Sequence, residues 1–354
     1  MVTVKLILIF ILCLLSSACQ VDAKTGKGAA SIVGRGIVNN PSNKSLRFDM
    51  LTFGLKKFCE ELLHNGTPLR LNDGQPVMGR FFGETCNAKS ISDQEKSTIF
   101  VQFGGKGYAW TAGTGRLGFR AQGLLELAPD FRIYENEMYV YFRPIQVDTS
   151  DFQLLMTERP LAQAAARIMD LSEEEIGRAI VSAQLGRGFT AIRYDADGNT
   201  DFALGLVDPG QAPFRHFQVV SSPRTTAANG RTEFYSGQMD FIGKLHVHDN
   251  EEIVVTLHVQ GAKQIDFALL KEESGASYLR GYLTQPGVKP LPVVPTFEAT
   301  AEDGQPTRAQ VKVPAGDYYL VLDHSSALGK TNPDQAALPA RVDYLIQTGR
   351  ANSR

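Results

Sequence analysis

Apolar and polar residues alternate between Thr98 and Val147, and this pattern predicts three consecutive antiparallel strands. We expect the strands at Thr98–Thr111, Leu117–Leu127 and Phe131–Val147, separated by turns at Gly113–Gly115 and Pro129–Asp130. Strands of this length form a long curved antiparallel sheet with one large apolar face, which helices must cover.

Two segments with apolar residues at three- and four-residue intervals predict the covering helices. The first is Leu46–His64, which Asn65-Gly66 ends, and the second is Ser172–Leu185, where Ser172 and Glu175 form a capping box. The buried stripe of the second helix is predicted to comprise Ile176, Ala179, Ile180 and Ala183. A short helix is expected at Pro160–Met169, and a hairpin of strands at Phe189–Tyr194 and Phe202–Val207.

The last third of the chain carries strand signals alone. Six strands are expected, at Met239–Val247, Glu252–Val259, Ile265–Leu270, Ala309–Val313, Tyr318–Leu322 and Arg341–Gln347. The fold class is therefore an α+β domain, with a long curved sheet packed on helices, followed by an all-β, jelly-roll-like sandwich. We assign residues 1–18 to a signal peptide, 19–44 to a tether, 45–220 to the first domain, 221–230 to a Pro/Ser/Thr/Gly-rich linker and 231–349 to the sandwich.

Composition restricts the class of partner. Hydrophobic residues make up 43% of the 354 residues, so the chain can form substantial cores. The formal net charge is −2, whereas a nucleic-acid-binding protein needs a basic face to displace phosphate counterions. A nucleic-acid partner is therefore not expected.

The first residues have the pattern of an export signal. Lys5 precedes the apolar run Leu6–Leu15, which is shorter than the ~20 residues that span a bilayer. Ser16 and Ala18 suit ordinary signal peptidase, but the following Cys19 also makes the segment resemble a bacterial lipobox. That resemblance implies that Cys19 is acylated and anchors the protein in the membrane. Gln20, in place of Asp, implies the outer membrane, with the protein facing the periplasm or the surface.

Besides Cys13 in the leader and Cys19, the chain has two cysteines, Cys59 and Cys86. An even pair in an oxidising compartment favours a disulfide, which would join the first helix to the strand carrying Cys86. Two buried free thiols are the alternative.

Two segments resemble ligand motifs but fit turns as well. Gly113–Gly118 matches G-x-G-x-x-G, yet it precedes a strand rather than a helix, which favours a glycine-rich hairpin over a nucleotide site. Oxygen-bearing side chains alternate in a second segment as in calcium loops, although an ordinary turn fits them too; they are Asp195, Asp197, Asn199 and Asp201.

Candidate catalytic groups are sparse. His246 and His248 lie on one side of a predicted strand, a spacing that zinc tolerates. Two solvent-exposed histidines are nevertheless a commoner outcome than a zinc site. Asp323-His324-Ser325 contains the triad residue types, but sequence neighbours cannot adopt triad geometry. We therefore expect a protein that is not an enzyme and that needs no cofactor.

Aromatic and small residues near the predicted sheet suggest an apolar ligand. A curved sheet with a helix across it can leave a slot for an acyl chain, although each such residue could equally be core. The candidate ligand-binding residues are Tyr108, Trp110 and Phe119 on the sheet, with Ala179, Ile180 and Ala183 on the helix.

Two resemblances accompany this reading. Pro314-Ala-Gly-Asp-Tyr-Tyr-Leu-Val-Leu322, with Ile265–Leu270, is similar to a strand pattern of the bacterial pre-peptidase C-terminal β-sandwich, which implies an accessory interaction module. The order of elements in the first half resembles that of tubular lipid-binding domains. The features that suggest this resemblance are the long sheet and the helix and hairpin of Ile176–Leu206.

Three functions follow in order of preference. The first is a non-enzymatic envelope lipoprotein, whose first domain binds an apolar ligand or lipid and whose sandwich contacts an envelope protein or polysaccharide. The second is a structural or scaffolding lipoprotein with protein partners alone. The third is a hydrolase with no visible motif.

Overall fold

The computed structural model describes residues 44–71, 75–92, 97–111, 113–135, 137–159, 172–194, 200–219, 223–329 and 339–350. By its internal contacts the chain divides into two compact units. Unit 1 holds the described residues within 1–55, 129–142 and 189–213, and unit 2 holds those within 56–128, 143–188 and 214–354. The signal peptide, the tether, Cys19 and the predicted helix Pro160–Met169 lie outside the described residues, except that Lys44 begins the first described helix.

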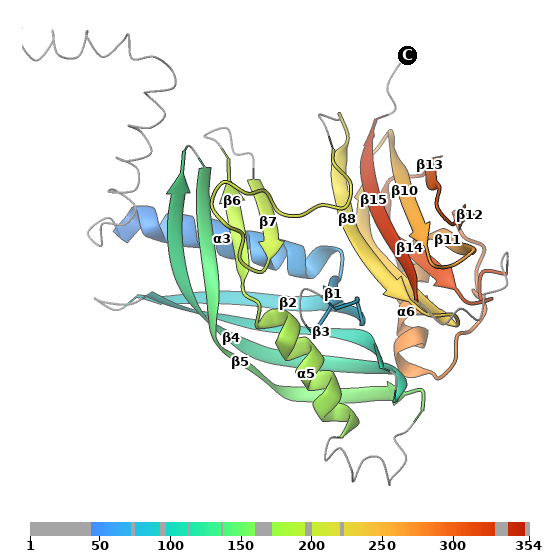
Figure 1. The fold of residues 1–354 in the computed structure, drawn as a ribbon, viewed down its shortest axis with the longest axis horizontal. Coiled ribbons are helices and arrows are strands. Elements are labelled where there is room, and N and C mark those ends of the chain that lie inside the picture. Colours follow the sequence, from blue (N-terminus) through green and yellow to red (C-terminus); the bar gives the residue numbers. More distant parts are fainter. Residues whose placement is uncertain are drawn as a thin grey trace, which may run out of the picture. The chain divides into compact units, whose positions relative to one another are not determined.

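The first half of the described chain forms an antiparallel sheet whose strand order follows the chain order, β1 to β7 (Figure 1). Its elements are α3 (Lys44–His64), β1 (Thr67–Leu69), β2 (Gly79–Ser92), β3 (Ser97–Thr111), β4 (Gly115–Tyr134), β5 (Glu137–Thr157), α5 (Glu173–Leu185), β6 (Phe189–Arg193) and β7 (Thr200–Leu204). The expected α+β class with a long curved sheet and helices is therefore confirmed.

The glycine-rich segment is the β3–β4 hairpin, as expected. Thr111 pairs with Gly115, and Gly115 has φ +68°, a conformation that glycine adopts without strain. The second predicted turn, Pro129–Asp130, is wrong, because β4 continues to Tyr134 and the chain reverses at Glu135. The pairing of β4 with β3 ends at Leu127, so the missing N–H of Pro129 removes no bond to β3.

The disulfide prediction is confirmed. Cys59 of α3 and Cys86 of β2 have their sulfur atoms 2.00 Å apart and their Cα atoms 5.5 Å apart. Gly83 allows this close packing, because a Cβ there would lie 2.6 Å from the carbonyl oxygen of Leu62. The second half of α3 is thus fixed to β2 by both packing and a covalent bond.

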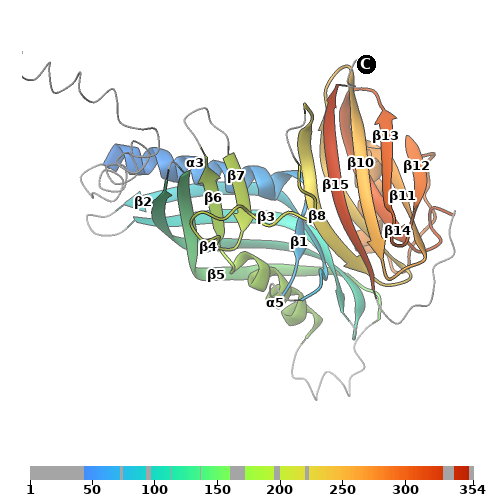
Figure 2. The same cartoon turned by 45° about the horizontal axis from the view of Figure 1, so that its top comes forward.

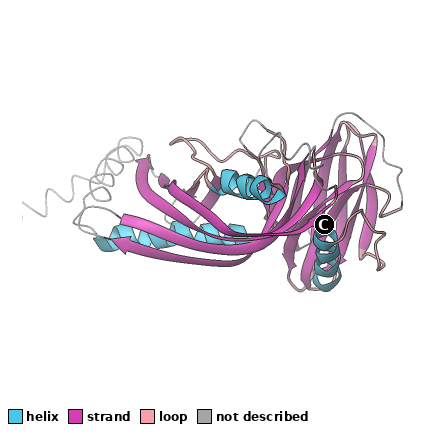
Figure 3. Ribbon diagram, turned by 90° about the horizontal axis from the view of Figure 1, so that it is seen from below, coloured by secondary structure: helices cyan, strands magenta, loops and turns pink. Residues whose placement is uncertain are grey.

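Helix α5 begins as predicted but turns a different face inward. Ser172 Oγ accepts a hydrogen bond from Glu175 N at 3.2 Å, and Glu175 Oε2 accepts one from Ser172 N at 2.6 Å. The buried residues are Gly177, Ile180, Val181, Gln184 and Leu185. Ala179 is exposed, and Ile176 and Ala183 are half-buried, so Ile180 is the one member of the predicted stripe that is buried. Gly177 faces the ring of Phe152, which occupies the space that a Cβ would need. Figure 3 draws the helices in cyan and the strands of the sheet in magenta.

Unit 1 has its own aromatic stack on β5, β6 and β7. The ring of Phe189 lies 4.3 Å from that of Phe142 and 5.7 Å from that of Phe202. The predicted hairpin at Phe189–Val207 is confirmed as β6 and β7.

The second half forms a sandwich of two four-stranded antiparallel sheets, with strand orders β13-β10-β15-β8 and β12-β11-β14-β9 in the described residues (Figure 2). Its elements are β8 (Thr225–Phe234), β9 (Gln238–Val247), β10 (Glu251–Gln260), β11 (Gln264–Lys271), α6 (Glu272–Thr284), β12 (Phe297–Glu302), β13 (Pro306–Lys312), β14 (Gly316–His324) and β15 (Ala340–Arg350). The predicted sandwich is confirmed. The predicted linker 221–230 is wrong over Thr225–Gly230, which pairs with β15 as part of β8.

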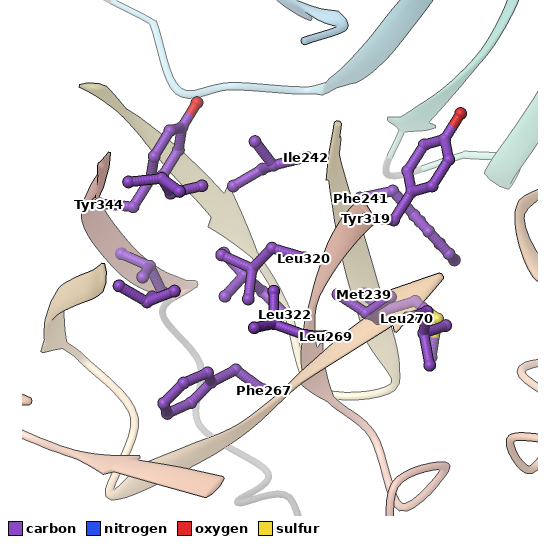
Figure 4. Packing of buried hydrophobic residues seen from close by; sticks show 14 of the residues in the cluster. Met239, Phe241, Ile242, Phe267, Leu269, Leu270, Tyr319, Leu320, Leu322 and Tyr344 are labelled. Carbon is purple, nitrogen blue, oxygen red and sulfur yellow. The ribbon is translucent and has the colours of Figure 1, made fainter. Parts of the chain in front are cut away.

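The sandwich core is a cluster of buried apolar residues from its strands, among them Ile242, Leu269 and Leu320 (Figure 4). Helix α6 was not predicted, because Gly275 and Gly281 lower its helix propensity and strand signals surround it. Gly275 is what lets the helix approach β14, since a Cβ there would lie 2.6 Å from the ring of Tyr319. Within the described residues, no helix has the length and apolarity needed to cross a membrane.

Candidate functional site

The six predicted ligand-binding residues do not converge. In the β3–β4 hairpin, Tyr108 is opposite Gly118 and Trp110 is opposite Arg116, whereas Phe119 is opposite Gly107. Directly opposed residues share a face and neighbours alternate, so Phe119 points away from Tyr108 and Trp110. The sequence does not give the register of the two strands, so it could not show that these aromatic residues lie on different faces.

The face of Phe119 is filled by protein. The ring of Phe119 lies 5.1 Å from that of Phe152 and 6.4 Å from that of Phe81. Val101 and Phe119 have 0% exposure, and Ile180 of α5 has 1%. Side chains this enclosed touch protein atoms on every side, as in an ordinary core.

The other face of the hairpin is built around a buried ion pair that joins β2 to β9. Arg80 Nε donates to Asp240 Oδ1 at 3.0 Å, and Arg80 Nη2 donates to Asp240 Oδ2 at 2.6 Å. Both side chains are 1% exposed. The remaining donor, Arg80 Nη1, reaches the carbonyl oxygen of Gly66 at 2.9 Å, and Tyr108 donates its hydroxyl to Asp240.

The electrostatics of this pair keep it ionised. Burial acts against the charged form of both groups, but each partner's charge and the hydrogen bonds outweigh it. The pKa of Asp240 therefore lies below its ordinary value and that of Arg80 well above. Burial and the Asp240 charge raise the pKa of Tyr108 well above its ordinary value, so Tyr108 remains a neutral donor. These pKa shifts mean that Arg80, Tyr108 and Asp240 do not change their protonation states near neutral pH.

An aromatic cluster surrounds the ion pair and contacts α6. Trp110 Nε1 donates to the hydroxyl of Tyr282 at 3.2 Å, and the rings of Tyr108 and Tyr282 lie 5.1 Å apart, edge to face. Phe241 of β9 lies 5.4 Å from Tyr282. Two of the predicted ligand-binding aromatics, Tyr108 and Trp110, are thus core residues shared by the sheet and the sandwich.

Arg116 completes this face by binding the end of α6. Its guanidinium carbon lies 3.7 Å from the ring centre of Tyr282, and its Nη2 donates to the carbonyl oxygens of Gln285 at 2.8 Å and Gly287 at 3.1 Å. Glu158 Oε1 lies 3.8 Å from Arg116 Nη2 and accepts the N–H of Gly287 at 3.1 Å. Arg116 therefore satisfies the carbonyl group of Gln285, the C-cap residue of α6, and one carbonyl group of the turn that follows.

Sequence reasoning missed the charged members of this cluster. The available signal was a single acid within an apolar strand, Met239-Asp240-Phe241-Ile242, and a single arginine between Gly79 and Phe81. A charge at a core position of a strand needs a buried partner, but the sequence does not say which one.

The three triad residue types do not form a triad. Asp323 Oδ1 accepts hydrogen bonds from Ser325 Oγ at 2.5 Å and Ser325 N at 2.8 Å, and Asp323 Oδ2 accepts one from Leu328 N at 2.9 Å. The His324 ring lies against Phe234, with 6.2 Å between ring centres. Asp323 and Ser325 thus bond each other directly, and they organise the turn after β14.

The histidine pair lies on the surface, as expected. Leu245 and Val247 are fully buried, while His246 and His248 are exposed and His246 Nδ1 is 2.7 Å from Asp317 Oδ1. Asp195, Asp197 and Asn199 lie outside the described residues, and Asp201 Oδ1 accepts the N–H of Phe202 at 2.8 Å. Among the residues described, no group of three metal-ligating side chains could hold an ion.

Comparisons with known proteins add little. No protein family model matches this sequence, and no curated protein matches it. Among solved structures, the chain is similar to a glycoside hydrolase family 43 arabinoxylan arabinofuranohydrolase from Bacillus subtilis in complex with cellotetraose. The identity is 8% and the TM-score 0.21, over 76% of this chain and 80% of that chain. A likeness this weak carries no argument about function.

Proposed function

We propose that this protein is a non-enzymatic scaffold of the bacterial cell envelope, exported and anchored in the outer membrane by an acylated Cys19, where it holds a protein partner. The anchor rests on the export signal and on the position of Cys19 directly after small residues. The periplasmic or surface location follows from the same signal.

The filled face of the hairpin is the observation that carries the choice of scaffold over lipid carrier. An acyl chain beneath the sheet would need space beside Ile99, Val101 or Phe119, and each of these side chains is 0% exposed. An acyl chain could enter this space only if α5 or β5 moved away, and that movement would break the packing of Phe152 on Phe119. A protein whose apolar faces are already covered offers its outer surface for contacts.

The ion pair between Arg80 and Asp240 supports the same proposal. It fixes the sandwich to the sheet at a buried point within unit 2, where water cannot compete. A scaffold benefits from such a rigid join, because two surfaces held at a fixed distance lose less entropy when a partner binds both.

The anchor can be tested by fractionation. Replacing Cys19 with Ala should release the protein from membranes, while Cys13→Ala, a change within the apolar leader, should leave it in the outer-membrane fraction. Immunoblots of separated membranes report both results. Full membrane retention of Cys19→Ala would refute the anchor.

The choice between scaffold and lipid carrier needs a second measurement. Native mass spectrometry of protein extracted in mild detergent should show the covalent acyl group and no further lipid in stoichiometric amount. Crosslinking in cells should recover a discrete protein partner. A noncovalent lipid bound one to one would overturn the scaffold and favour the carrier.

A further inference from the structure

Two histidines and an aspartate meet on the exposed face of the sandwich sheet that contains β9. His246 lies in β9, His248 follows the last residue of that strand, and Asp317 of β14 is directly opposite His246 in the strand ladder. The imidazole rings of His246 and His248 have their centres 4.5 Å apart, at an interplanar angle of 80°. The scaffold proposed above makes no use of these three side chains.

The backbone holds both histidines in place. Leu245 and Val247 are fully buried, and neighbouring residues of a strand point to opposite faces, so His246 points to solvent. His248 lies in the turn to β10, where its N–H donates to Glu251 Oε2 at 3.0 Å and its carbonyl oxygen accepts the N–H of Glu251 at 3.2 Å. The folded chain therefore presents the two rings side by side.

Asp317 determines which nitrogen of His246 can bind a ligand. His246 Nδ1 lies 2.7 Å from Asp317 Oδ1. An ionised carboxylate only accepts hydrogen bonds, so in the neutral imidazole Nδ1 carries the proton and Nε2 has the lone pair. The side chain of His246 is 57% exposed, so an ion in solution can reach the ring. Histidines that bind metal ions usually donate their other ring nitrogen to such a carboxylate or to a carbonyl group.

The charges of the neighbouring side chains do not oppose a cation. Lys244, two residues before His246, forms an ion pair with Glu272 of α6, which offsets the positive charge of the lysine. Asp317, beside His246, contributes a negative charge. A divalent cation at the histidines is attracted by this carboxylate without having to displace it from His246.

We propose that His246 and His248 bind one divalent transition-metal ion, such as zinc or copper. Imidazole nitrogen suits zinc, copper and nickel, whereas calcium and magnesium prefer oxygen ligands. Two nitrogen atoms at ~2.0–2.1 Å from one tetrahedral zinc ion lie about 3.3 Å apart, and exposed rings as close as these reach that separation by turning about their side-chain bonds.

The site has two protein ligands. No group of three ligating side chains occurs in the part of the chain that the structure describes, so water or a group of another molecule completes the coordination of the ion. Asp317 is a positioning residue, because it bonds Nδ1 of His246 on the side away from the metal-binding nitrogen.

Zinc binding is measured by calorimetric titration of the full chain from residue 19, carrying Cys19→Ala so that a thiol at this position does not contribute. The parent should bind one zinc ion at this site, and excess magnesium should not compete. His246→Asn and His248→Asn should each weaken zinc binding roughly tenfold or more, since a ligand contributes at least as much as its outer-shell partner.

His64→Asn is the matched control. His64 is an exposed histidine of α3 whose Nδ1 also lies 2.7 Å from an oxygen atom, the carbonyl oxygen of Glu60. This variant should bind zinc as the parent does. No saturable zinc binding by the folded parent would overturn the proposal. Zinc binding that His246→Asn and His248→Asn both retain at full strength would overturn it too.

Asp317→Asn tests the positioning role with a readout that a purely structural role would not change. The variant should weaken zinc binding about tenfold. An amide can donate to Nδ1, so the nitrogen-15 chemical shifts of the His246 ring should show a larger share of the tautomer that is protonated at Nε2. Unchanged affinity together with an unchanged tautomer would overturn the role of Asp317.

Discussion

At the scale of single residues, the Arg80–Asp240 pair determines how the sheet and sandwich join. Each of the three guanidinium nitrogens of Arg80 donates a hydrogen bond to Asp240 or to the carbonyl oxygen of Gly66, so several hydrogen bonds offset the desolvation cost of the two charges. The ion pair specifies one arrangement of β2 and β9, because a bidentate hydrogen bond fixes the positions of both partners. An apolar contact between the same strands would allow them to shift. Removing one partner should therefore cost far more than removing both.

We predict that Asp240→Ala lowers the free energy of unfolding by about 3–5 kcal/mol, because it leaves the Arg80 charge buried and unpaired. The double variant Arg80→Met, Asp240→Leu should recover most of that loss. Urea unfolding of the three proteins measures the difference. Equal losses in the single and double variants would contradict the proposed role of the pair.

The pH dependence gives the same test another form. Because Arg80 and the hydrogen bonds hold the pKa of Asp240 below its ordinary value, its contribution is fully present at neutral pH. It should be lost as the pH falls through the folded pKa, so the stability gap between the parent protein and Asp240→Asn should shrink only under acid conditions.

At the scale of elements, close backbone approaches position α6. A Cβ at Gly118 of β4 would lie 1.9 Å from the carbonyl oxygen of Leu283, so the end of α6 rests directly on the strand. Arg116, two residues earlier, binds the carbonyl oxygens that follow α6. The β3–β4 hairpin thus supplies both the contact surface and the cap for a helix of the sandwich.

A matched pair of glycine substitutions tests this contact. Gly118→Ala should lower stability by about 1–3 kcal/mol or more, since backbone atoms must move to admit the methyl group. Gly281→Ala, where nothing lies within 4 Å of the added carbon, should instead raise stability by up to about 1 kcal/mol through helix propensity. Thermal unfolding of both variants measures the contrast. Similar effects of the two changes would mean that α6 does not rest on β4.

At the scale of the whole molecule, one core serves the sheet and the sandwich within unit 2. Phe82, Tyr108 and Trp110 belong to the same hydrophobic cluster as the buried residues of the sandwich. The limits 45–220 and 231–349 stay a prediction, but a shared core leads us to expect that these segments do not unfold separately.

The single tryptophan reports on this core. Trp110 is 6% exposed and donates its N–H to Tyr282 of α6, so its fluorescence should change when the sandwich leaves the sheet. We expect the fluorescence transition in urea to coincide with the loss of strand signal in circular dichroism. Two separated midpoints would show that the sheet and the sandwich unfold as independent domains.

Several features of this protein could be read from the sequence because they depend on local chemistry. The capping box of Ser172 and Glu175, the glycine hairpin at Gly113–Gly115 and the alternation in the β-sandwich each follow from neighbours a few residues apart. The pairing of Cys59 with Cys86 followed from counting thiols in a chain that begins with the pattern of an export signal.

Only the tertiary structure decided which faces meet. Strand register placed Phe119 on the other face of the sheet from Tyr108 and Trp110. Packing turned Ala179 outward, and pairing with β15 made a strand of a segment with the composition of a linker. Arg80 and Asp240 are 160 positions apart in the sequence, and nothing local distinguishes them from other pairs of opposite charge that do not meet. Long-range contacts of this kind depend on the summed packing of many residues, so no local pattern encodes them.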